Sequence, residues 1–179
     1  MRSVISRSLI SKFSRNGDFL LQLGVRTNNM AVEIQSKKAI VSKAPYELYM
    51  GFVDMRNFVR FLPEEKRQGV EADYDTIKAE VQGFTIGVKV VERVPYSRIV
   101  FQDDGAPFQF ELVLFFNPAP ADPYKTEFQI ILEAELNFMM KTILGGKLKD
   151  ALDKVVDSLV AVSEGRMPEG FDPSMMPKA

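Results

Sequence analysis

The sequence predicts an α+β fold in which an antiparallel sheet of six to seven strands is followed by one long C-terminal helix. Three observations indicate this order of elements. Apolar and polar residues alternate through most of residues 76–136, apolar residues recur at helical spacing through residues 137–165, and two short helical patterns follow the first strand. Consecutive strands joined by short turns, without helices between them, pair antiparallel.

The first strand and the two short helices precede the main sheet. Apolar residues separated by polar ones predict a strand over residues 32–42. Pro45 suits a first helical turn, where its missing N–H would be unpaired anyway, and the spacing of the next apolar residues predicts a helix over residues 45–53. Asp54 can cap a second helix, which ends at Pro63.

The same alternation predicts the strands of the main sheet. They are expected at residues 76–81, 84–94, 98–103, 108–116 and 126–136, and residues 117–123, with three prolines, are expected to form a loop. Glu92 has the same parity as Phe84 and Val90. It therefore either points inward, where burial would raise its pKa, or meets water at the end of its strand.

A long helix is predicted from Asn137 to Gly165, because glycine is a natural stop for a helix. Its apolar stripe consists of Leu144, Leu148, Leu152, Val155, Leu159 and Val162. Gly145 and Gly146 lie near the start of this helix, and together they lower its stability by about 2 kcal/mol relative to two alanines. A local reason is therefore expected: a hinge at a cavity mouth, close packing against a strand, or a cap between two helical pieces.

The composition excludes several classes of function. The chain has no His and no Cys, which removes Ser-His-Asp and Cys-His catalysis and the usual zinc and haem ligands. Its formal net charge is −1 with no basic block in the body, so nucleic-acid binding is not expected. No apolar run approaches the roughly 20 residues that span a bilayer, so we do not expect an integral membrane protein.

The two ends differ from the body, and three regions are expected. Residues 1–29 are rich in Arg and Ser and hold five basic residues and one acidic residue, which leaves the rest of the chain at a net charge of −5. They are interpreted as an over-extended start or a disordered arm, as a targeting leader, or as an extra ordered element. Residues 30–165 are the domain, and residues 166–179 are expected to be a disordered tail. A cytoplasmic location is expected, or an organelle if residues 1–29 are a transit peptide.

The segment AIVSKAPYELYMGFVDMRNFVRFLP contains a strand, an Ala-Pro turn and a small helix that ends near Asp54, followed by Asn57 and Leu62-Pro63. With the order of elements and the terminal helix, it resembles the START/SRPBCC superfamily, including its polyketide cyclase–like and plant pollen-allergen–like branches. The resemblance covers about residues 32–165. It implies a helix-grip fold, in which a curved sheet wraps the long helix and leaves an apolar cavity between them.

The resemblance also implies a candidate site that lies between the sheet and the helix. The expected cavity residues are Phe84, Ile86, Val88, Phe101, Phe108, Phe110, Leu112, Phe128, Ile130, Met140, Leu144 and Leu148, with Gly145 and Gly146 as the hinge at its mouth. Ordinary packing of sheet against helix is the alternative for each of these side chains. No catalytic residue, metal or cofactor is expected.

Members of this superfamily bind lipids, sterols, polyketides or other apolar molecules, and some are enzymes. The first hypothesis is a non-enzymatic module that binds a small hydrophobic or amphipathic, lipid-like ligand, as a monomer or a weak homodimer. The alternatives are a cyclase- or dehydratase-type enzyme that uses Asp, Glu or Tyr in the cavity, and a protein-interaction module with an exposed apolar patch.

Overall fold

The computed structural model describes residues 30–60, 67–81, 84–106 and 108–166. Residues 1–29 and almost all of the expected tail lie outside this part of the chain, as do Phe61, Leu62 and Pro63 of the expected second helix. The strands are β1 (Met30–Gln35), β2 (Ala39–Val41), β3 (Val70–Ala72), β4 (Thr76–Val81), β5 (Phe84–Val94), β6 (Arg98–Asp103), β7 (Phe110–Ala119) and β8 (Asp122–Leu136). The helices are α2 (Pro45–Phe52), α3 (Arg56–Arg60) and α5 (Phe138–Ser163).

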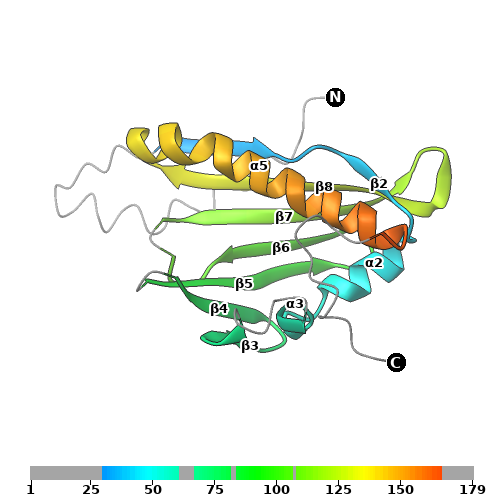
Figure 1. Ribbon diagram of the computed structural model, residues 1–179, viewed down its shortest axis with the longest axis horizontal. Helices are drawn as coiled ribbons and strands as arrows, with labels where there is room; N and C mark the ends of the chain where they lie inside the picture. The colour runs from blue at the N-terminus through cyan, green and yellow to red at the C-terminus, as the bar shows by residue number, and fades with distance from the viewer. Residues whose placement is uncertain (1–29, 61–66, 82–83, 107, 167–179) are drawn as a thin grey trace.

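The strands form one antiparallel sheet, and α5 crosses one side of it (Figure 1). The strand order is β1-β8-β7-β6-β5-β4-β3, and β2 extends the edge that β1 begins because it also pairs with β8. The predicted α+β fold with two short helices and a long terminal helix is confirmed. The described sheet has eight strands instead of six to seven, because the first expected strand is two strands and β3 was not expected.

The break between β1 and β2 lies at Ser36. The hydroxyl of Ser36 accepts the N–H of Ile130 at 2.9 Å, so a side chain replaces the backbone acceptor at this point of the ladder. The backbone N–H of Lys37 is then free to leave the sheet and donates to Asp153 of α5 at 2.6 Å. The interruption therefore ties the edge of the sheet to the helix.

The β7–β8 hairpin is longer than the sequence indicates. Residues 117–123 were expected to be a loop, but Pro118 lies opposite Thr126 and Ala119 lies opposite Asp122. The expectation was wrong because proline still offers its carbonyl to a ladder and is tolerated where the register shifts, as it does between Pro118 and Ala119.

An irregularity in β5 decides where the side chains at its end point. The register with β6 shifts between Val90 and Glu92, so Glu92 lies opposite Val100 and Arg93 lies opposite Ile99. One extra residue reverses the side-chain alternation. Glu92 therefore points away from the helices and pairs with Arg98 at 3.1 Å. The parity that put Glu92 inward was wrong, and Arg93 takes the inward position.

Helix α5 begins and ends as the sequence indicates. The side chain of Asn137 accepts the N–H of Met140 at 2.8 Å, which caps the first turn. At the other end Gly165 has a φ of +71°, and the N–H groups of Gly165 and Arg166 donate to the carbonyls of Val162 and Ala161. This pattern is a Schellman cap, which requires a left-handed residue.

In the part of the chain that the structure describes, no helix is long and apolar enough to cross a membrane.

The predicted apolar stripe of α5 is partly wrong. Val156 is fully buried, whereas Val155 is 45% exposed and Val162 is also exposed. The helix contacts β1, β2 and β8 but lies near that edge of the sheet, so only one flank of its apolar face reaches the strands. Sequence spacing locates the apolar face of a helix, but the position of the helix over the sheet decides which flank is covered.

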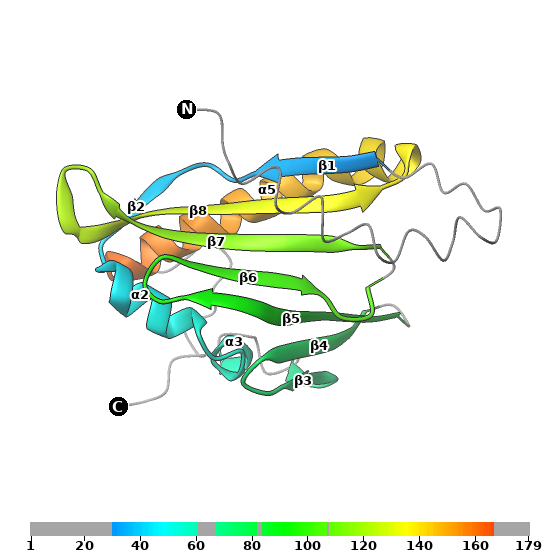
Figure 2. The same ribbon diagram turned by 180° about the vertical axis from the view of Figure 1, so that it is seen from behind.

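We call the side of the sheet that packs against the helices the helix face and the opposite side the outer face. Seen from the outer side, β1, β7 and β8 lie in front of α5 (Figure 2). Side chains alternate between the two faces along a strand, and directly opposite residues of paired strands share a face. Leu132, Ala134 and the residues paired with them therefore belong to the helix face, and Glu133 and the residues paired with it belong to the outer face.

Candidate functional site between the sheet and the terminal helix

One end of the helix face is closed by α2. Phe52 of α2 packs against Phe116 and Phe128, with ring centroids 5.7 and 5.8 Å apart, and Tyr49 meets Phe116 edge-on at 5.8 Å. Phe116 and Phe128 are fully buried, as is Val156 of α5. This end is a compact aromatic core, because rings of this size exclude water from the whole contact.

The other end of the helix face is not closed to the same extent. Ile86 is 38% exposed, and its neighbours on the helix face remain half-buried although they are apolar. We call this region the open half of the helix face. Its members are Ile77, Ile86, Val88, Val90, Phe108, Phe110 and Leu112 of the sheet and its loops, and Leu148, Leu152, Val155 and Leu159 of α5.

The helix contributes to the open half from the flank that faces away from the β1–β2 edge. Asp153 and Asp157 bind Lys37 at that edge, through its backbone N–H and its ammonium group respectively. Val155 lies two residues from each of these aspartates, about 200° around the helix axis. It therefore projects toward the β4–β6 side of the sheet, which α5 does not cover (Figure 1).

The structure divides the expected cavity residues into three groups. Phe101, Phe128 and Ile130 are buried in the compact core with α2. Ile86, Val88, Phe108, Phe110, Leu112, Met140 and Leu148 are half-buried or exposed and lie in or beside the open half. Phe84 and Leu144 belong to β5 and α5, but the positions of their side chains lie outside what the structure describes.

Five open-half residues, Leu159 of the predicted helix stripe among them, were absent from the predicted site. Ile77 and Val90 share the parity of the predicted strand residues, so the alternation pattern could have identified them. Leu152 and Val155 were in the predicted stripe of the helix. They were not assigned to a ligand because spacing does not separate the flank that packs from the flank that stays open.

Gly145 and Gly146 lie within a continuous helix. A Cβ atom built on either glycine meets no other heavy atom within 4 Å. Neither close packing against a strand nor a cap between two helical pieces accounts for the pair, and both expectations were wrong. The hinge expectation stays a prediction.

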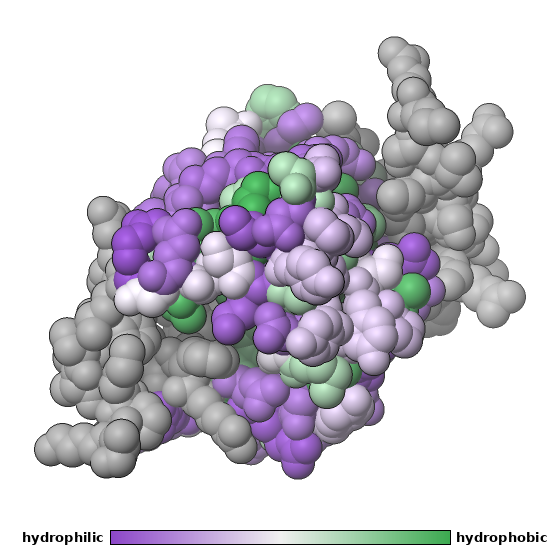
Figure 3. Space-filling view, turned by 90° about the vertical axis from the view of Figure 1, so that its right-hand side faces the viewer, coloured by the Kyte–Doolittle hydropathy of each residue, from purple (hydrophilic) through white to green (hydrophobic). Residues whose placement is uncertain are grey.

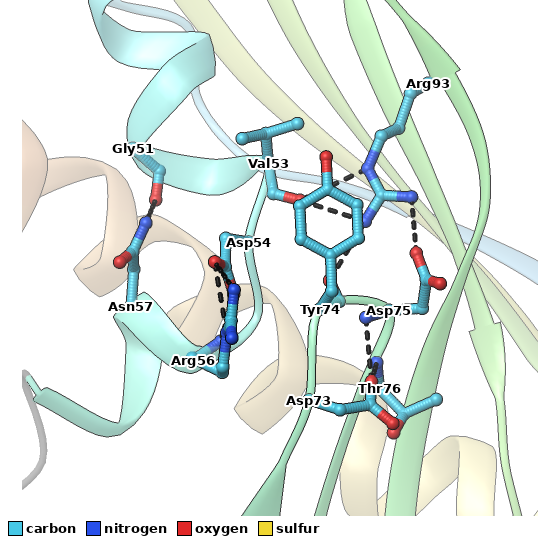
Figure 4. Close-up of polar contacts among 10 residues, drawn as sticks. All are labelled: Gly51, Val53, Asp54, Arg56, Asn57, Asp73, Tyr74, Asp75, Thr76 and Arg93. Atoms are coloured by element: carbon cyan, nitrogen blue, oxygen red, sulfur yellow. Dashed lines mark hydrogen bonds and ion pairs between the residues drawn. The ribbon is translucent and has the colours of Figure 1, made fainter.

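Arg93 connects three segments beside the compact core (Figure 4). Its guanidinium donates to the carbonyls of Val53 and Tyr74 at 2.9 and 3.0 Å, and to the carboxylate of Asp75 at 2.6 Å. The same group lies 4.5 Å from the centre of the Tyr74 ring, within the range of a cation–π contact. Arg93 thereby holds the segment between α2 and α3 and the β3–β4 turn against β5.

Polar groups on the helix face are engaged by the protein itself. Asp103 follows Phe101 by two residues and so shares its side of β6, and its carboxylate accepts the N–H of Phe110 at 3.3 Å. Thr126 is fully buried and donates to the carbonyl of Lys43 at 2.7 Å. Burial raises the pKa of the Tyr49 phenol, so this group stays protonated near neutral pH. Within residues 30–60, 67–81, 84–106 and 108–166, no cluster of acidic side chains could hold a metal ion.

The exposed apolar side chains outside the open half are unevenly placed. The end of the molecule that carries α2 and the last turns of α5 is largely hydrophilic, with apolar residues in small separate areas (Figure 3). At the start of α5, Phe138 is 78% exposed, and Met139 and Ile143, one turn apart, are also exposed. A protein-interaction module requires a contiguous exposed apolar patch. Among the described residues, this group of three resembles such a patch most.

Comparison with known proteins gives a likeness in structure. No protein-family model matches the chain, and no curated protein matches it. A norcoclaurine synthase from a Thalictrum species, solved in complex with a transition-state analogue, superposes with a TM-score of 0.59 at 10% identity, over 78% of this chain and 98% of its own.

Two further solved structures have the same arrangement. A protein from Thermobifida fusca gives a TM-score of 0.57 at 13% identity, over 74% of this chain and 93% of its own. A START superfamily protein from Mycobacterium smegmatis gives 0.51 at 16% identity, over 73% of this chain and 96% of its own. At such low identity the likeness concerns the fold, and it confirms the fold that the sequence resemblance implied.

Proposed function

We propose that this protein, which has the START/SRPBCC helix-grip fold, binds a small hydrophobic or amphipathic ligand in the open half of the helix face. The observation that carries the proposal is the contrast between the two ends of that face. Phe116 and Phe128 at the α2 end are completely buried, whereas Ile86, Val88 and Phe110 remain partly exposed on the same side of the same sheet.

The proposed ligand would cover apolar surface that the protein leaves in contact with water. Each 100 Å² of apolar surface removed from water contributes about 2.5 kcal/mol before the cost of ordering the ligand. Val155 of α5 is also exposed, and Leu148 is only half-buried, so a ligand lying beside the helix would contact apolar groups of both the sheet and α5. A lipid-like molecule with a flexible chain suits such a surface.

Binding without catalysis is the reading we favour. An enzyme would need an acid or a base that faces the ligand. The carboxylate of Asp103 accepts the N–H of Phe110, at the start of β7. The guanidinium of Arg93 donates to backbone carbonyls and to Asp75. Both side chains are therefore already bound to other parts of the protein. The norcoclaurine synthase that shares the fold is an enzyme, but a shared fold does not carry over an activity.

The test is titration of the full-length protein with a fluorescent fatty acid, with native mass spectrometry to detect ligand carried through purification. We expect saturable binding. The double variant Ile86→Gln/Val88→Gln should weaken it about tenfold or more, because two polar amides replace apolar contacts of about 1 kcal/mol each or more.

Val91→Gln is the matched control, because Val91 belongs to the same strand and is already 44% exposed at the register shift. This variant should bind like the parent protein. If thermal unfolding shows that the double variant does not fold, Ile86→Gln alone serves, since its side chain is partly exposed already. Absence of saturable binding, or equal weakening by Val91→Gln, would show that the open half is not the ligand site.

A further inference from the structure

The outer face of the sheet carries three glutamates in one row. Glu33 of β1 lies directly opposite Glu133 of β8, and Glu133 lies directly opposite Glu111 of β7. Cβ atoms of directly opposite residues in an antiparallel pair are about 5 Å apart, and like charges in such pairs are destabilising. Gln102 of β6 continues the row and donates to one oxygen of Glu111 at 3.0 Å.

The middle of this row is buried although it lies on the outer face. Glu111 is only 3% exposed, and its second carboxylate oxygen, Oε1, has no hydrogen-bond partner. A buried carboxylate oxygen without a donor is costly, so such groups are normally satisfied by a cation or a hydrogen-bond donor. Burial also raises the pKa of Glu133, with smaller contributions from Glu33 and Glu111.

An apolar row lies beside the acidic one. Val100 lies opposite Val113, and Val113 lies opposite Ile131. Each of the three is two residues away from the member of the acidic row on its own strand. Val100 and Val113 are each 6% exposed. Among the residues that the structure describes, no helix passes in front of these strands on the outer side (Figure 2). The surface therefore has the properties of a covered interface: a dry apolar row with an unsatisfied acidic row along one side.

We propose that residues 1–29 of this chain dock on the outer face, with their basic side chains on the row Glu33–Glu133–Glu111 and their apolar side chains on Val100, Val113 and Ile131. The proposal concerns the side of the sheet opposite the ligand and is independent of it.

The composition of this segment matches the surface. Residues 1–29 hold five basic residues and one acidic residue, and Ile5, Leu9 and Phe13 recur every fourth position. Arg and Lys supply the donors that the free oxygen of Glu111 lacks, and the apolar residues suit the neighbouring row. The charge of the segment is opposite to the net charge of the body.

The connection to β1 allows this placement. Residue 29 immediately precedes Met30, the first residue of β1, and Glu33 follows three residues later in the same strand. Glu111 is two strands away from β1, or about 10 Å. A 29-residue segment reaches on the order of 40 Å even when it is wholly helical, so it can cover the row and return.

The test places a nitroxide spin label at residue 11 through Ser11→Cys, which gives a single thiol because the chain has no Cys. In the full-length protein at low salt, the label should broaden the methyl signals of Val100, Val113 and Ile131 and leave those of Val90 and Ile77 on the helix face sharp. The double variant Glu33→Gln/Glu133→Gln, or about 0.5 M salt, should remove at least half of the broadening because charge pairing weakens.

Glu71→Gln/Glu80→Gln is the matched control, because both glutamates are exposed near the far edge of the sheet. It should leave the broadening unchanged. Equal sharpness of the methyl groups on both faces of the unaltered protein would overturn the proposal. So would broadening that appears only between labelled and unlabelled molecules, since a second copy would then occupy the outer face.

Discussion

Arg93 shows how one residue can join parts of the fold that are distant in sequence. The register shift in β5 turns Arg93 to the helix face, where its guanidinium binds carbonyls before α3 and in the β3–β4 turn. Without the extra residue, Glu92 would take that position and present a carboxylate to the same carbonyls. The irregularity in the strand therefore determines the sign of the charge at this junction.

Replacing Arg93 by alanine should lower the free energy of unfolding by about 2–3 kcal/mol, because backbone carbonyls lose charged donors in a half-buried site. Urea unfolding followed by circular dichroism measures this change. Arg98→Ala is the control, because Arg98 and its partner Glu92 are both well exposed and such pairs contribute about 0–1 kcal/mol. Similar losses in the two variants would contradict the assigned role of Arg93.

At the scale of elements, the position of α5 is fixed at the edge of the sheet. Asp153 accepts the backbone N–H of Lys37, which lies between β1 and β2, at 2.6 Å. Ser163 accepts the backbone N–H of Ser42 at 3.0 Å near the other end of the helix. These contacts hold one flank of α5 against β1 and β2, which leaves the opposite flank, with Val155, for the open half.

The hydrogen bond from Lys149, followed by that from the Lys37 backbone, holds the pKa of Asp153 below its usual 3.8. A carboxyl with a depressed folded-state pKa stabilises the protein above its unfolded pKa, and this stability is lost as the pH falls through the folded value. Asp153→Asn should therefore be less stable than the parent protein at pH 7, and the difference should shrink below about pH 4.

Thermal unfolding from pH 7 to pH 3 measures this convergence. Asp150→Asn is the control, because Asp150 is exposed on the same helix, and it should track the parent protein across the range. A constant difference between Asp153→Asn and the parent would mean that the charge of Asp153 does not stabilise the helix position.

The two glycines of α5 permit a test of the hinge. Gly145→Ala/Gly146→Ala should raise the free energy of unfolding by up to about 2 kcal/mol, because glycine is a poor helix former and a Cβ meets open space at both positions. If the pair is a hinge, the fluorescent fatty acid should also dissociate more slowly, as stopped-flow displacement would show. Higher stability with an unchanged dissociation rate would remove the hinge assignment.

At the scale of the whole molecule, the sheet separates three regions with different roles. The α2 end of the helix face supplies a compact aromatic core, the β4–β6 side of the same face leaves apolar groups partly exposed, and the outer face carries the acidic row. The proposed ligand and the proposed docking segment would therefore occupy opposite sides of one sheet. Substitutions at the proposed ligand site leave the residues of the proposed docking surface unchanged, and the reverse also holds.

Much of the fold could be predicted from the sequence because it depends on local patterns. Alternation predicted β4 and β6 to the residue, and Asn137 and Gly165 predicted the two ends of α5. These signals are local because side-chain parity, helix caps and turn residues act over a few positions. The break at Ser36, the register shift near Val91 and the long hairpin were not predicted, since each depends on what the neighbouring strand offers.

The sequence by itself determined that apolar residues line one side of the sheet and one side of a long helix, and that no His or Cys chemistry is present. Only the tertiary structure decided which of those residues form a closed core and which stay partly exposed. Phe128 and Ile86 both lie on the apolar side of an alternating strand. Phe128 is nevertheless covered by Phe52 of α2, whereas Ile86 remains 38% exposed. Whether a side chain is buried depends on partners brought from distant positions, and local periodicity contains no information about them.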